Sequence, residues 1–377
     1  MHVALDARLA HYTAGGIAHY TLNLARALAE IAPDDRFTLL RSVKQRAASL
    51  PRARNLRSLP LFTPPHHRLE QLALPLELLR ARPDVLHCPD FIPPFWRTCP
   101  AVITVHDVAF LRYPETLTAE SRRYYGQVRR AIASAERTIV VSEATARDLA
   151  TLLHVPRERV RVVHNGLDRR FLEPPDPAEQ ARVRARWQLD RPYLFFLGTL
   201  EPRKDIPTLL RAFREVRARH PDLLLVLAGR RGWLYEPIFS ETDALGLREA
   251  VRHIEDASDA DLPPLFDGAT AFAYPSRYEG FGLPPLEALA RGIPTVVADT
   301  SSLPEVVGDA ALLHAPGDAG ALAAALFRLI EDTALRADLA VRGPQRAAGF
   351  TWERAARETL AVYHEAREAR SAHTSRR

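Results

Sequence analysis

The feature that most constrains the fold is a regular alternation of short apolar runs with amphipathic helical patterns. The runs are rich in Val, Ile, Leu and Phe, and they form two series: 2–8, 36–42, 85–88, 101–107, 137–142 and 159–164, then 192–200, 222–229, 251–255, 270–274, 294–298 and 311–314. Continuous apolar strands are typical of parallel sheets covered by helices on both faces. The sequence therefore predicts an α/β protein with two Rossmann-like, doubly wound domains.

The proline-rich stretch 172–177 (LEPPDP) separates the two series and is typical of a linker. A chain of 377 residues suits two domains of average size. We expect an N-terminal domain at 1–170 and a C-terminal domain at 178–349. A last helical segment, about 350–370, is a candidate to return and pack on the N-terminal domain.

Composition excludes several classes of protein. The first residues, MHVALDARLA, lack a basic segment followed by a long apolar run, so no signal peptide is expected. No run approaches the ~20 apolar residues of a membrane-spanning helix. Cys88 and Cys99 cannot form a disulfide scaffold, and no Cys/His cluster has zinc spacing. These observations predict a cytoplasmic protein in a reducing compartment.

The basic residues are almost all arginine. The formal net charge is +5, and among 51 Lys and Arg residues only Lys44 and Lys204 are lysines. Because lysine is so rare in this chain, a lysine at a given position indicates a specific role more strongly than an arginine does. No aromatic stacking motif accompanies the basic residues, so nucleic-acid binding is not expected.

A glycine pair follows the first apolar run. Gly15 and Gly16 precede a helical pattern, IAHYTLNLARAL. Glycines at a strand-to-helix turn let backbone amides approach a phosphate at the helix N-terminus. A simple tight turn explains the pair equally well, and both interpretations stay open. The pattern is not G-x-G-x-x-G, which argues against a dinucleotide cofactor.

The run 101–107 ends in His106 and Asp107. Ligands bind at the carboxyl ends of strands in open parallel sheets, so both side chains are candidates for a ligand site. A histidine there can hydrogen-bond a sugar hydroxyl or stabilise positive charge at an anomeric carbon. Capping of a nearby backbone carbonyl is the alternative, and position alone does not choose between the two.

Two adjacent cations follow the run 192–200. Arg203 and Lys204 stand just before a helical pattern at 206–219. Two positive charges beside a helix N-terminus are what a pyrophosphate needs where no metal neutralises it. A solvated surface position is the alternative, and the rarity of lysine argues against it.

The segment 274–294 carries two glutamates eight residues apart, Glu279 and Glu287. The residues after Glu279 are Gly280, Phe281, Gly282 and Leu283, and their amides can donate to a ligand. Prolines follow at the expected start of a helix. Glu279 on the loop can accept from sugar hydroxyls, and Glu287, one turn into the helix, can accept from a ribose diol.

These segments resemble the retaining glycosyltransferases of family 4, which have the GT-B fold. The Glu-x7-Glu pattern with the Arg-Lys pair is the most specific part of the resemblance, which covers nearly the whole chain. The matching segments are AGGIAHY, TVHD, VVSEATARDL, VVHNGLD, GTLEPRKDIPTLLRAF, LVLAGRRGW and AYPSRYEGFGLPPLEALARGIPTVVADTSSLPEVVGDAALL.

The resemblance implies a nucleotide-sugar donor, held in the cleft between two facing domains without a metal or other cofactor. It places Arg203 and Lys204 on the diphosphate and Glu287 on the ribose. It assigns orientation of the transferred sugar to Glu279 and the amides of 280–283. From the N-terminal domain, Gly15 and Gly16 would approach the phosphates and His106 would face the sugar; Asp107 is carried over more weakly, and Asn165 belongs to a structural turn.

The resemblance is closest to bacterial mannosyl- and rhamnosyltransferases that build O-antigen and other polysaccharides. It suggests mannose from GDP-mannose as the transferred group and a glycan or a lipid-linked molecule as the acceptor. Two alternatives stay open: another two-domain enzyme, such as a nucleotide-sugar epimerase or a phosphorylase, and an inactive nucleotide-sugar-binding module.

Two further patterns need an interpretation. Asp259-Ala260-Asp261 spells D-x-D, a metal-binding string of a different glycosyltransferase fold; we interpret Asp259 as a helix N-cap instead. The segment 41–82 holds nine Lys/Arg against two glutamates. Its arginines are open to anionic lipid, hence to peripheral contact with the inner membrane. Its leucines are predicted to pack internally: Leu69, Leu72, Leu76 and Leu79.

Overall fold

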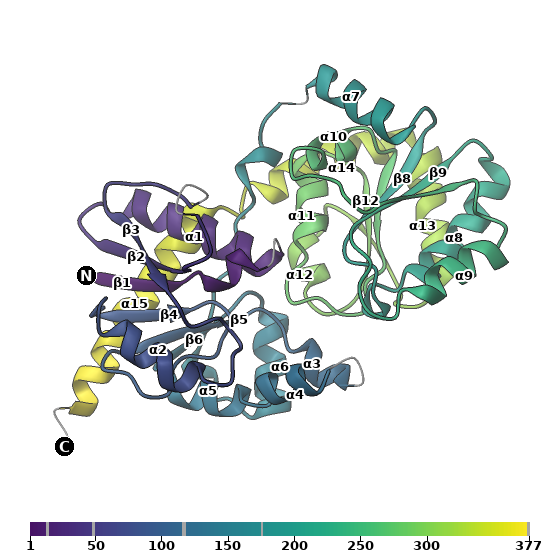
Figure 1. Ribbon diagram of the computed structural model, residues 1–377. Coiled ribbons are helices and arrows are strands. Elements are labelled where there is room, and N and C mark those ends of the chain that lie inside the picture. The colour runs from purple at the N-terminus through teal and green to yellow at the C-terminus, as the bar shows by residue number, and fades with distance from the viewer. Residues whose placement is uncertain (13–14, 47–49, 115–117, 175, 375–377) are drawn as a thin grey trace. The chain divides into compact units, whose positions relative to one another are not determined.

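The computed structural model describes residues 1–12, 15–46, 50–114, 118–174 and 176–374 of the 377. Ala14 of the glycine turn and Pro175 of the expected linker lie outside these residues. The chain divides into two compact units (Figure 1). Unit 1 is Met1–Gly166 with Phe350–Arg377, and unit 2 is Leu167–Gly349.

Unit 1 is built on a seven-stranded parallel sheet in the order β3-β2-β1-β4-β5-β6-β7. Its central strands are buried along their length, as expected for a sheet covered on both faces. The strands are β1 (His2–Asp6), β2 (Arg36–Ser42), β3 (Leu56–Leu61), β4 (Val85–Cys88), β5 (Ala101–Val105), β6 (Arg137–Val140) and β7 (Val160–Val162).

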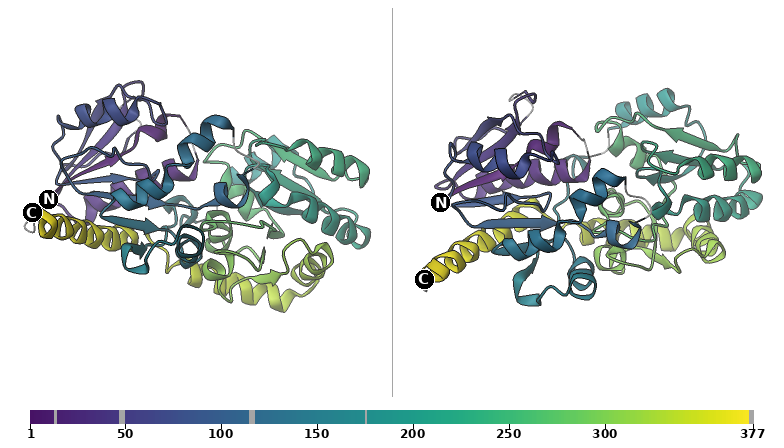
Figure 2. Two further views of the ribbon diagram at one scale, coloured as in Figure 1. Left: turned by 90° about the horizontal axis from the view of Figure 1, so that it is seen from below. Right: turned by 60° about the horizontal axis from the view of Figure 1, so that its bottom comes forward.

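The helices of unit 1 occur in most but not all of the connections between its strands, and the last one returns from the far end of the sequence. The α-helices are α1 (Gly16–Ile31), α2 (Glu70–Leu78), α3 (Ala109–Arg112), α4 (Ala119–Tyr125), α5 (Val128–Ser134), α6 (Glu143–Leu153) and α15 (Trp352–Thr374). Short 3-10 helices are η1 (Arg8–His11) and η4 (Arg157–Arg159). Both chain ends therefore belong to unit 1, as Figures 1 and 2 show.

The helix α15 packs along α1 and against β4, β5 and β6 (Figure 2). One buried hydrogen bond ties it to the sheet: the Nδ1 of His87 lies 2.7 Å from the hydroxyl of Tyr363. Where the chain leaves and re-enters unit 1, a Cβ on Gly166 would lie 2.3 Å from the nitrogen of Trp352. Only glycine fits there, which explains the Asn165-Gly166 turn in local packing terms.

Unit 2 holds a six-stranded parallel sheet in the order β10-β9-β8-β11-β12-β13. Its strands are β8 (Tyr193–Leu197), β9 (Leu224–Ala228), β10 (Val251–Ile254), β11 (Ala271–Tyr274), β12 (Thr295–Ala298) and β13 (Leu312–His314). The helices are α7 (Pro177–Trp187), α8 (Ile206–Arg219), α9 (Glu236–Ala244), α10 (Leu262–Asp267), α11 (Leu283–Ala290), α12 (Leu303–Val307), α13 (Ala319–Glu331) and α14 (Thr333–Ala347), with 3-10 helices η5 (Arg169–Phe171) and η6 (Pro202–Lys204). The predicted pair of Rossmann-like parallel sheets is confirmed.

All twelve predicted strands are present, but one further strand was missed. The missed strand is β3, at the edge of the first sheet. Its sequence, LRSLPL, has only a weak apolar pattern and contains a proline. A proline is tolerated at a sheet edge, where a missing amide leaves no ladder bond unmade.

The division between the units falls at Gly166 rather than in the expected linker at 172–177. The intervening residues pack on unit 2. Arg170 pairs with Asp259 at 3.0 Å, and the buried ring of Phe171 packs edge-on against Phe266. The expected boundary at residue 170 is therefore displaced by four residues, since these contacts depend on partners some 90 residues away along the chain.

The prediction that the leucines at 69, 72, 76 and 79 pack internally is wrong, because all four are exposed. The helix α2 buries a different face, through Glu70, Leu74, Pro75 and Leu78. Among the described residues, no helix is long and apolar enough to cross a membrane.

Candidate active site

The turn after β8 places two cations at the carboxyl edge of the unit 2 sheet. The short helix η6 carries Arg203 and Lys204, and Asp205 then adopts a left-handed conformation (φ 49°) before α8 begins. Its carboxylate accepts a hydrogen bond from the hydroxyl of Thr208 at 2.9 Å, which fixes the first turn of α8. The predicted order of strand, cations and helix is confirmed.

Glu279 bridges the two cations from the loop after β11. The Nη1 of Arg203 donates to its Oε2 at 2.9 Å, and the Nζ of Lys204 donates to its Oε1 at 2.5 Å. Lys204 also donates to the hydroxyl of Tyr274 at 2.7 Å, and its side chain is buried. The strands β8 and β11 are neighbours in the sheet, so residues 75 positions apart meet at one edge.

The bridge changes the acidity of both partners. Burial alone would raise the pKa of Glu279, but Arg203 and Lys204 outweigh it and hold the pKa at about 2. Burial, helped by the charge of Arg203, lowers the pKa of Lys204, although Glu279 opposes this shift. Glu279 is therefore a permanent anion at neutral pH.

A second carboxylate completes the charge balance. The Nε of Arg203 lies 2.6 Å from Oε1 of Glu201, whose Oε2 accepts from the indole of Trp233 at 3.1 Å. Two cations thus face two carboxylates, and the group is close to neutral before any anion binds. An incoming diphosphate has to compete with a carboxylate for the cations.

Two serines hold the loop from Glu279 to Gly282 in place by hydrogen bonds. The amide of Glu279 donates to the Oγ of Ser301 at 3.0 Å, and the Oγ of Ser302 donates to the carbonyls of Glu279 and Phe281 at 3.0 and 2.7 Å. Gly282, the N-cap of α11, has a φ of 110°, which favours glycine. The loop geometry is set by its own unit and needs no ligand.

Glu287 sits in a different environment, in the second turn of α11. It is half-buried, and its carboxyl group has no hydrogen bond or ion pair with any residue in the described part of the chain. Burial raises its pKa to about 8; Arg170 lowers it, while Asp168 and Asp259 add to the rise. At neutral pH the carboxyl group is mostly protonated, so it can donate as well as accept a hydrogen bond.

In unit 1 the glycine pair is exposed. Gly15 is the N-cap of α1, and a Cβ built on Gly16 has nothing within 4 Å. Neither residue has the positive φ that would demand glycine. Local packing therefore does not explain Gly16, and a tight turn and close approach of a ligand both stay hypotheses for the pair.

His106 follows β5 and packs edge-on against the ring of Tyr20, with centroids 4.7 Å apart. Burial lowers its pKa to about 4, against smaller opposing effects of Asp90 and the Pro89 backbone, so the ring is neutral at pH 7. Its Nε2 is buried without a hydrogen-bond partner among the described residues. The ring also hydrogen-bonds the backbone of Pro89, as the capping alternative predicts, while Nε2 is left for a ligand, so both interpretations stay open.

Asp107, the weaker candidate beside it, has a local structural role. Its Oδ1 accepts a hydrogen bond from the amide of Ala109 at 2.9 Å, which shapes the turn into α3.

A buried polar cluster at the same edge of unit 1 was missed by the sequence analysis. Arg8 is buried and contacts Asp6 at 2.6 Å and Glu70 at 2.5 Å, and Asp90 contacts His66. Burial alone would lower the pKa of His66, but Asp90 and Glu70 raise it. The signal was available: Asp6 ends β1 and Asp90 follows β4, as His106 follows β5.

Both aspartates of the D-x-D string pair with arginines of unit 2, but the N-cap assignment to Asp259 is wrong. The N-cap position of α10 is Asp261, which accepts from Arg182 at 2.8 Å and Arg186 at 3.1 Å. Asp259 instead pairs with Arg170. In the residues that the structure describes, no group of three or more His, Cys, Asp or Glu side chains could hold a metal ion; metal independence stays a prediction.

The structure brings together Arg203, Lys204 and Glu279 by direct contacts and puts Glu287 on the helix that follows. Of the predicted residues of unit 1, His106 directly follows β5, whereas Gly15 and Gly16 stand at the start of α1, separated from β1 by η1. The sheet order makes the strand-end positions of each unit converge on one edge.

Comparison with known proteins gives a consistent result. Residues 14–171 match the family described as Glycosyltransferase Family 4, and residues 177–346 match Glycosyl transferases group 1. The chain is 35% identical over 286 residues to O-antigen chain mannosyltransferase B of Escherichia coli, which covers 74% of each chain. It is 34% identical over 287 residues to D-inositol 3-phosphate glycosyltransferase of Salinispora tropica, covering 71% of this chain and 59% of that protein.

The fold also matches solved structures along nearly the whole chain. A sucrose-phosphate synthase from Thermosynechococcus elongatus superposes with a TM-score of 0.78 at 21% identity, over 97% of this chain and 98% of the other. At that identity the likeness concerns the fold alone.

Proposed function

The chain belongs to glycosyltransferase family 4 and is a hexosyltransferase of glycan synthesis with the GT-B fold, and on that premise we propose a mannosyltransferase. The proposed reaction moves mannose, with retention, from GDP-mannose to a glycan or lipid-linked acceptor in polysaccharide or O-antigen synthesis. The similarity to an O-antigen mannosyltransferase supports this donor and pathway. A cytoplasmic location, which two buried free thiols, Cys88 and Cys99, support, belongs to the same proposal.

The observation that carries the proposal is the pairing of Arg203 and Lys204 with one carboxylate at a strand end. A donor diphosphate presents oxygens that both cations can bind. Because the cation group is already balanced by Glu201 and Glu279, the diphosphate is expected to displace Glu279 from at least one cation. The released carboxylate can then accept from hydroxyls of the transferred sugar.

Glu287 suits the nucleotide ribose. Its carboxyl group has no competing partner among the described residues and is half-buried in the second turn of α11. A ribose diol offers two hydroxyls that both donate and accept, which a carboxyl group can satisfy in either protonation state. No metal ion is required in this proposal, because Arg203 and Lys204 neutralise the diphosphate.

The chemical step is a substitution at the anomeric carbon. The bond from that carbon to the donor phosphate oxygen breaks, and a bond to the acceptor oxygen forms on the same face of the sugar. The acceptor proton passes to the departing phosphate oxygen, so no covalent enzyme intermediate is needed. Arg203 and Lys204 stabilise the charge that grows on the phosphate.

His106 contributes from unit 1 as a neutral ring. Its unpartnered Nε2 can bond a hydroxyl of the sugar or face the positive charge that develops at the anomeric carbon. A pKa of about 4 means that the ring brings no positive charge of its own at neutral pH.

Replacement of single residues tests the site. With GDP-mannose and a suitable acceptor, Lys204→Ala and Glu287→Ala are each expected to lower kcat/KM, on the order of a hundredfold for Lys204. Arg248→Ala is the matched control, because Arg248 is exposed and pairs with Asp243 on the surface of unit 2. Near wild-type kcat/KM in both site variants would show that the site is misplaced.

The donor is tested by thermal unfolding in the presence of candidate ligands. GDP-mannose at a hundredfold excess over its Kd should stabilise the protein by about 2.7 kcal/mol, and UDP-glucose, UDP-N-acetylglucosamine and dTDP-rhamnose should do less. A larger shift with one of these three would reassign the donor. Unchanged turnover after treatment with EDTA tests metal independence.

A further inference from the structure

A row of exposed leucines runs along one side of α2. Leu69, Leu72, Leu76 and Leu79 are 53%, 73%, 60% and 46% exposed. At 100° per residue their positions fall within an arc of about 80° on the helix. We call these four residues the leucine face. Other large apolar side chains are also exposed, among them Leu172 and Leu234 in unit 2; an exposed apolar side chain that stands singly needs no explanation.

Both acidic residues of α2 are engaged inside the protein. Glu70 is buried and accepts from Arg8 at 2.5 Å and from the amide of His66 at 2.9 Å. Glu77 accepts from the amides of Phe62 and Thr63 at 3.1 to 3.2 Å, at the end of β3. Glu70 is therefore neutralised by Arg8, and Glu77 keeps its charge with its oxygens directed to the backbone after β3, so one carboxylate stands against the three arginines beside the leucine face.

Exposed arginines stand at both ends of the leucine face. Arg68 precedes it, and Arg80 and Arg82 follow it; all three are exposed. The outward side of this segment thus combines apolar and positive side chains.

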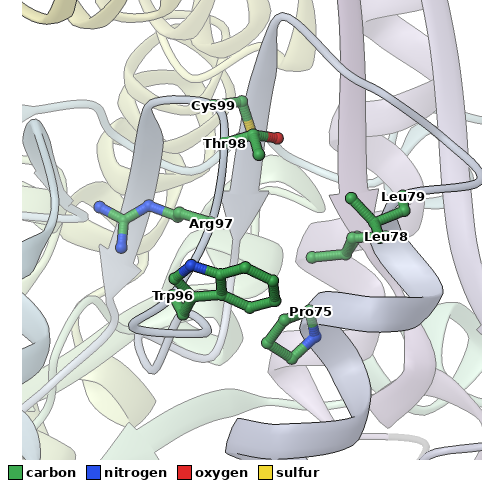
Figure 3. A pocket seen from close by; sticks show the side chains of 7 residues that line it. All are labelled: Pro75, Leu78, Leu79, Trp96, Arg97, Thr98 and Cys99. Atoms are coloured by element: carbon green, nitrogen blue, oxygen red, sulfur yellow. The ribbon is translucent and has the colours of Figure 1, made fainter.

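A tryptophan extends the same surface. Trp96 is 63% exposed and lies across a small hollow of about 20 Å³ from Pro75, Leu78 and Leu79 of the α2 segment (Figure 3). Indole rings favour the boundary between water and lipid, since one end is apolar and the other donates a hydrogen bond. The hollow has room for about one water molecule and is too small for a larger ligand. It shows that the surface between Trp96 and the α2 segment is apolar and uneven.

We propose that the leucine face, with Trp96 and the flanking arginines, docks this protein on an anionic lipid bilayer. Leucines that point outward enter the interface region, and arginines at their ends meet the lipid phosphates, as in helices that lie in the membrane surface. The inference rests on the proposed function only in that a membrane surface is where a lipid-linked acceptor would be found.

Charge argues for lipid over a second copy of the chain. In a symmetric dimer the same patch meets itself, so Arg68, Arg80 and Arg82 of one copy would face arginines of the other. Like charges at a contact disfavour association. An anionic bilayer complements the arginines and accepts the leucines at the same time.

Vesicle co-sedimentation tests the proposal with the full chain. Wild type should bind vesicles of phosphatidylglycerol and phosphatidylcholine, bind pure phosphatidylcholine far less, and lose binding in 0.5 M salt, a concentration at which the Debye length is about 4 Å. Leu72→Ser/Leu76→Ser should lower the apparent partition coefficient at least about tenfold. The matched control, Leu172→Ser/Leu234→Ser, removes leucines of similar exposure (61% and 58%) from unit 2 and should bind like wild type.

The charge contribution is tested in the same way. Arg80→Gln/Arg82→Gln should weaken binding to phosphatidylglycerol vesicles several-fold, whereas Arg248→Gln should not. Wild type that does not bind, or a leucine variant that binds as wild type does, would overturn the proposal. So would a dimer in vesicle-free solution that dissociates when Leu72 and Leu76 are replaced.

A nucleotide-binding control separates this proposal from the proposed function. The thermal shift with GDP-mannose should be equal in wild type and in the Leu72→Ser/Leu76→Ser variant, because the leucine face lies on unit 1 and the cation group on unit 2. Loss of vesicle binding with an unchanged shift supports the lipid proposal. Absence of any donor shift in both proteins contradicts the donor assignment alone.

Discussion

Glu279 and Glu287 stand eight residues apart, and the structure gives them opposite chemistry. Glu279 lies on the loop after β11, touches two cations and has a pKa of about 2. Glu287 lies inside α11, has no described partner and has a pKa of about 8. One sequence motif therefore delivers a fixed anion and a mostly neutral carboxyl group.

The difference shows how the position of a glutamate relative to the sheet edge determines its partners and hence the protonation state of its carboxyl group. The loop brings Glu279 over the carboxyl end of β8, where Arg203 and Lys204 compensate its burial. The helix carries Glu287 away from that end, toward the acids Asp168 and Asp259, and only Arg170 opposes the rise. Burial is costly for both groups, but only one of them is paired.

The largest effect is expected from Glu279→Gln. Glu201 still pairs with Arg203, so loss of the Glu279 anion leaves one excess positive charge, mainly at the buried Lys204. This should cost about 3 kcal/mol of unfolding free energy and lower kcat/KM about a hundredfold or more. Because the folded pKa lies below the unfolded value, this stabilisation is present above pH 4.5 and is lost as pH falls toward 2. Urea unfolding at pH 7 and at pH 3 measures it; equal stability loss at both would contradict the ionic explanation.

A double-mutant cycle sharpens the assignment of the anion's partner. Glu279→Gln combined with Lys204→Met should be less destabilising than the sum of the single changes, with a coupling energy of about 2 kcal/mol. The pair Glu279→Gln and Arg248→Gln is the control, since Arg248 has another partner, Asp243. Additive effects in the first cycle would mean that Lys204 and Glu279 act independently.

Glu287→Gln should do the reverse and stabilise the protein at alkaline pH. The folded pKa of about 8 lies above the unfolded value of 4.5, so the wild-type carboxyl group loses stability progressively as pH rises through that window. The variant escapes this loss, and its advantage should reach about 2 kcal/mol near pH 9, below what the full pKa difference implies because the side chain is half-buried. Thermal unfolding of both proteins at pH 5 and pH 9 checks this; no gain at pH 9 contradicts the raised pKa.

The smallest effect concerns the surroundings of Glu287. Asp259→Asn removes a negative charge that raises the pKa of Glu287, so the pKa should fall by about half a unit. Two differences in unfolding free energy are measured against pH: wild type minus Glu287→Gln, and Asp259→Asn minus Asp259→Asn/Glu287→Gln. The midpoint of each difference, the pH at which it is half-complete, reports the pKa of Glu287 in that protein. Arg170→Gln should move this midpoint in the opposite direction, and a shift of the same sign in both would refute the electrostatic account.

The sequence was sufficient for the framework and for the contacts at strand ends. Continuous apolar runs identified twelve strands, and the carboxyl ends of neighbouring parallel strands meet by necessity, so Arg203, Lys204 and Glu279 could be grouped in advance. The strand β3 escaped because its residues include a proline and an arginine at an exposed edge. Family membership followed from motifs that cover both domains.

Properties that depend on distant partners could not be derived. The neutral state of Glu287 arises from burial and from Asp168, Arg170 and Asp259, none of which is near it in sequence. The helix α2 is apolar on two sides, and periodicity alone did not show that Leu74 and Leu78 face inward while Leu72 and Leu76 face outward. The polar cluster around Arg8 joins three segments, 6–8, 66–70 and 90; the strand ends mark Asp6 and Asp90, but nothing in the sequence marks Glu70 as their neighbour.

The return of α15 to unit 1 has a consequence for synthesis on the ribosome. Unit 2 is one uninterrupted stretch, so it can fold as soon as Gly349 has emerged. Unit 1 must wait for its last helix, whose Tyr363 reaches back 276 residues to His87. Until translation ends, the face of α1 that α15 covers remains open to water and to chaperones, and loss of the C-terminal residues should harm the first-made unit rather than the second.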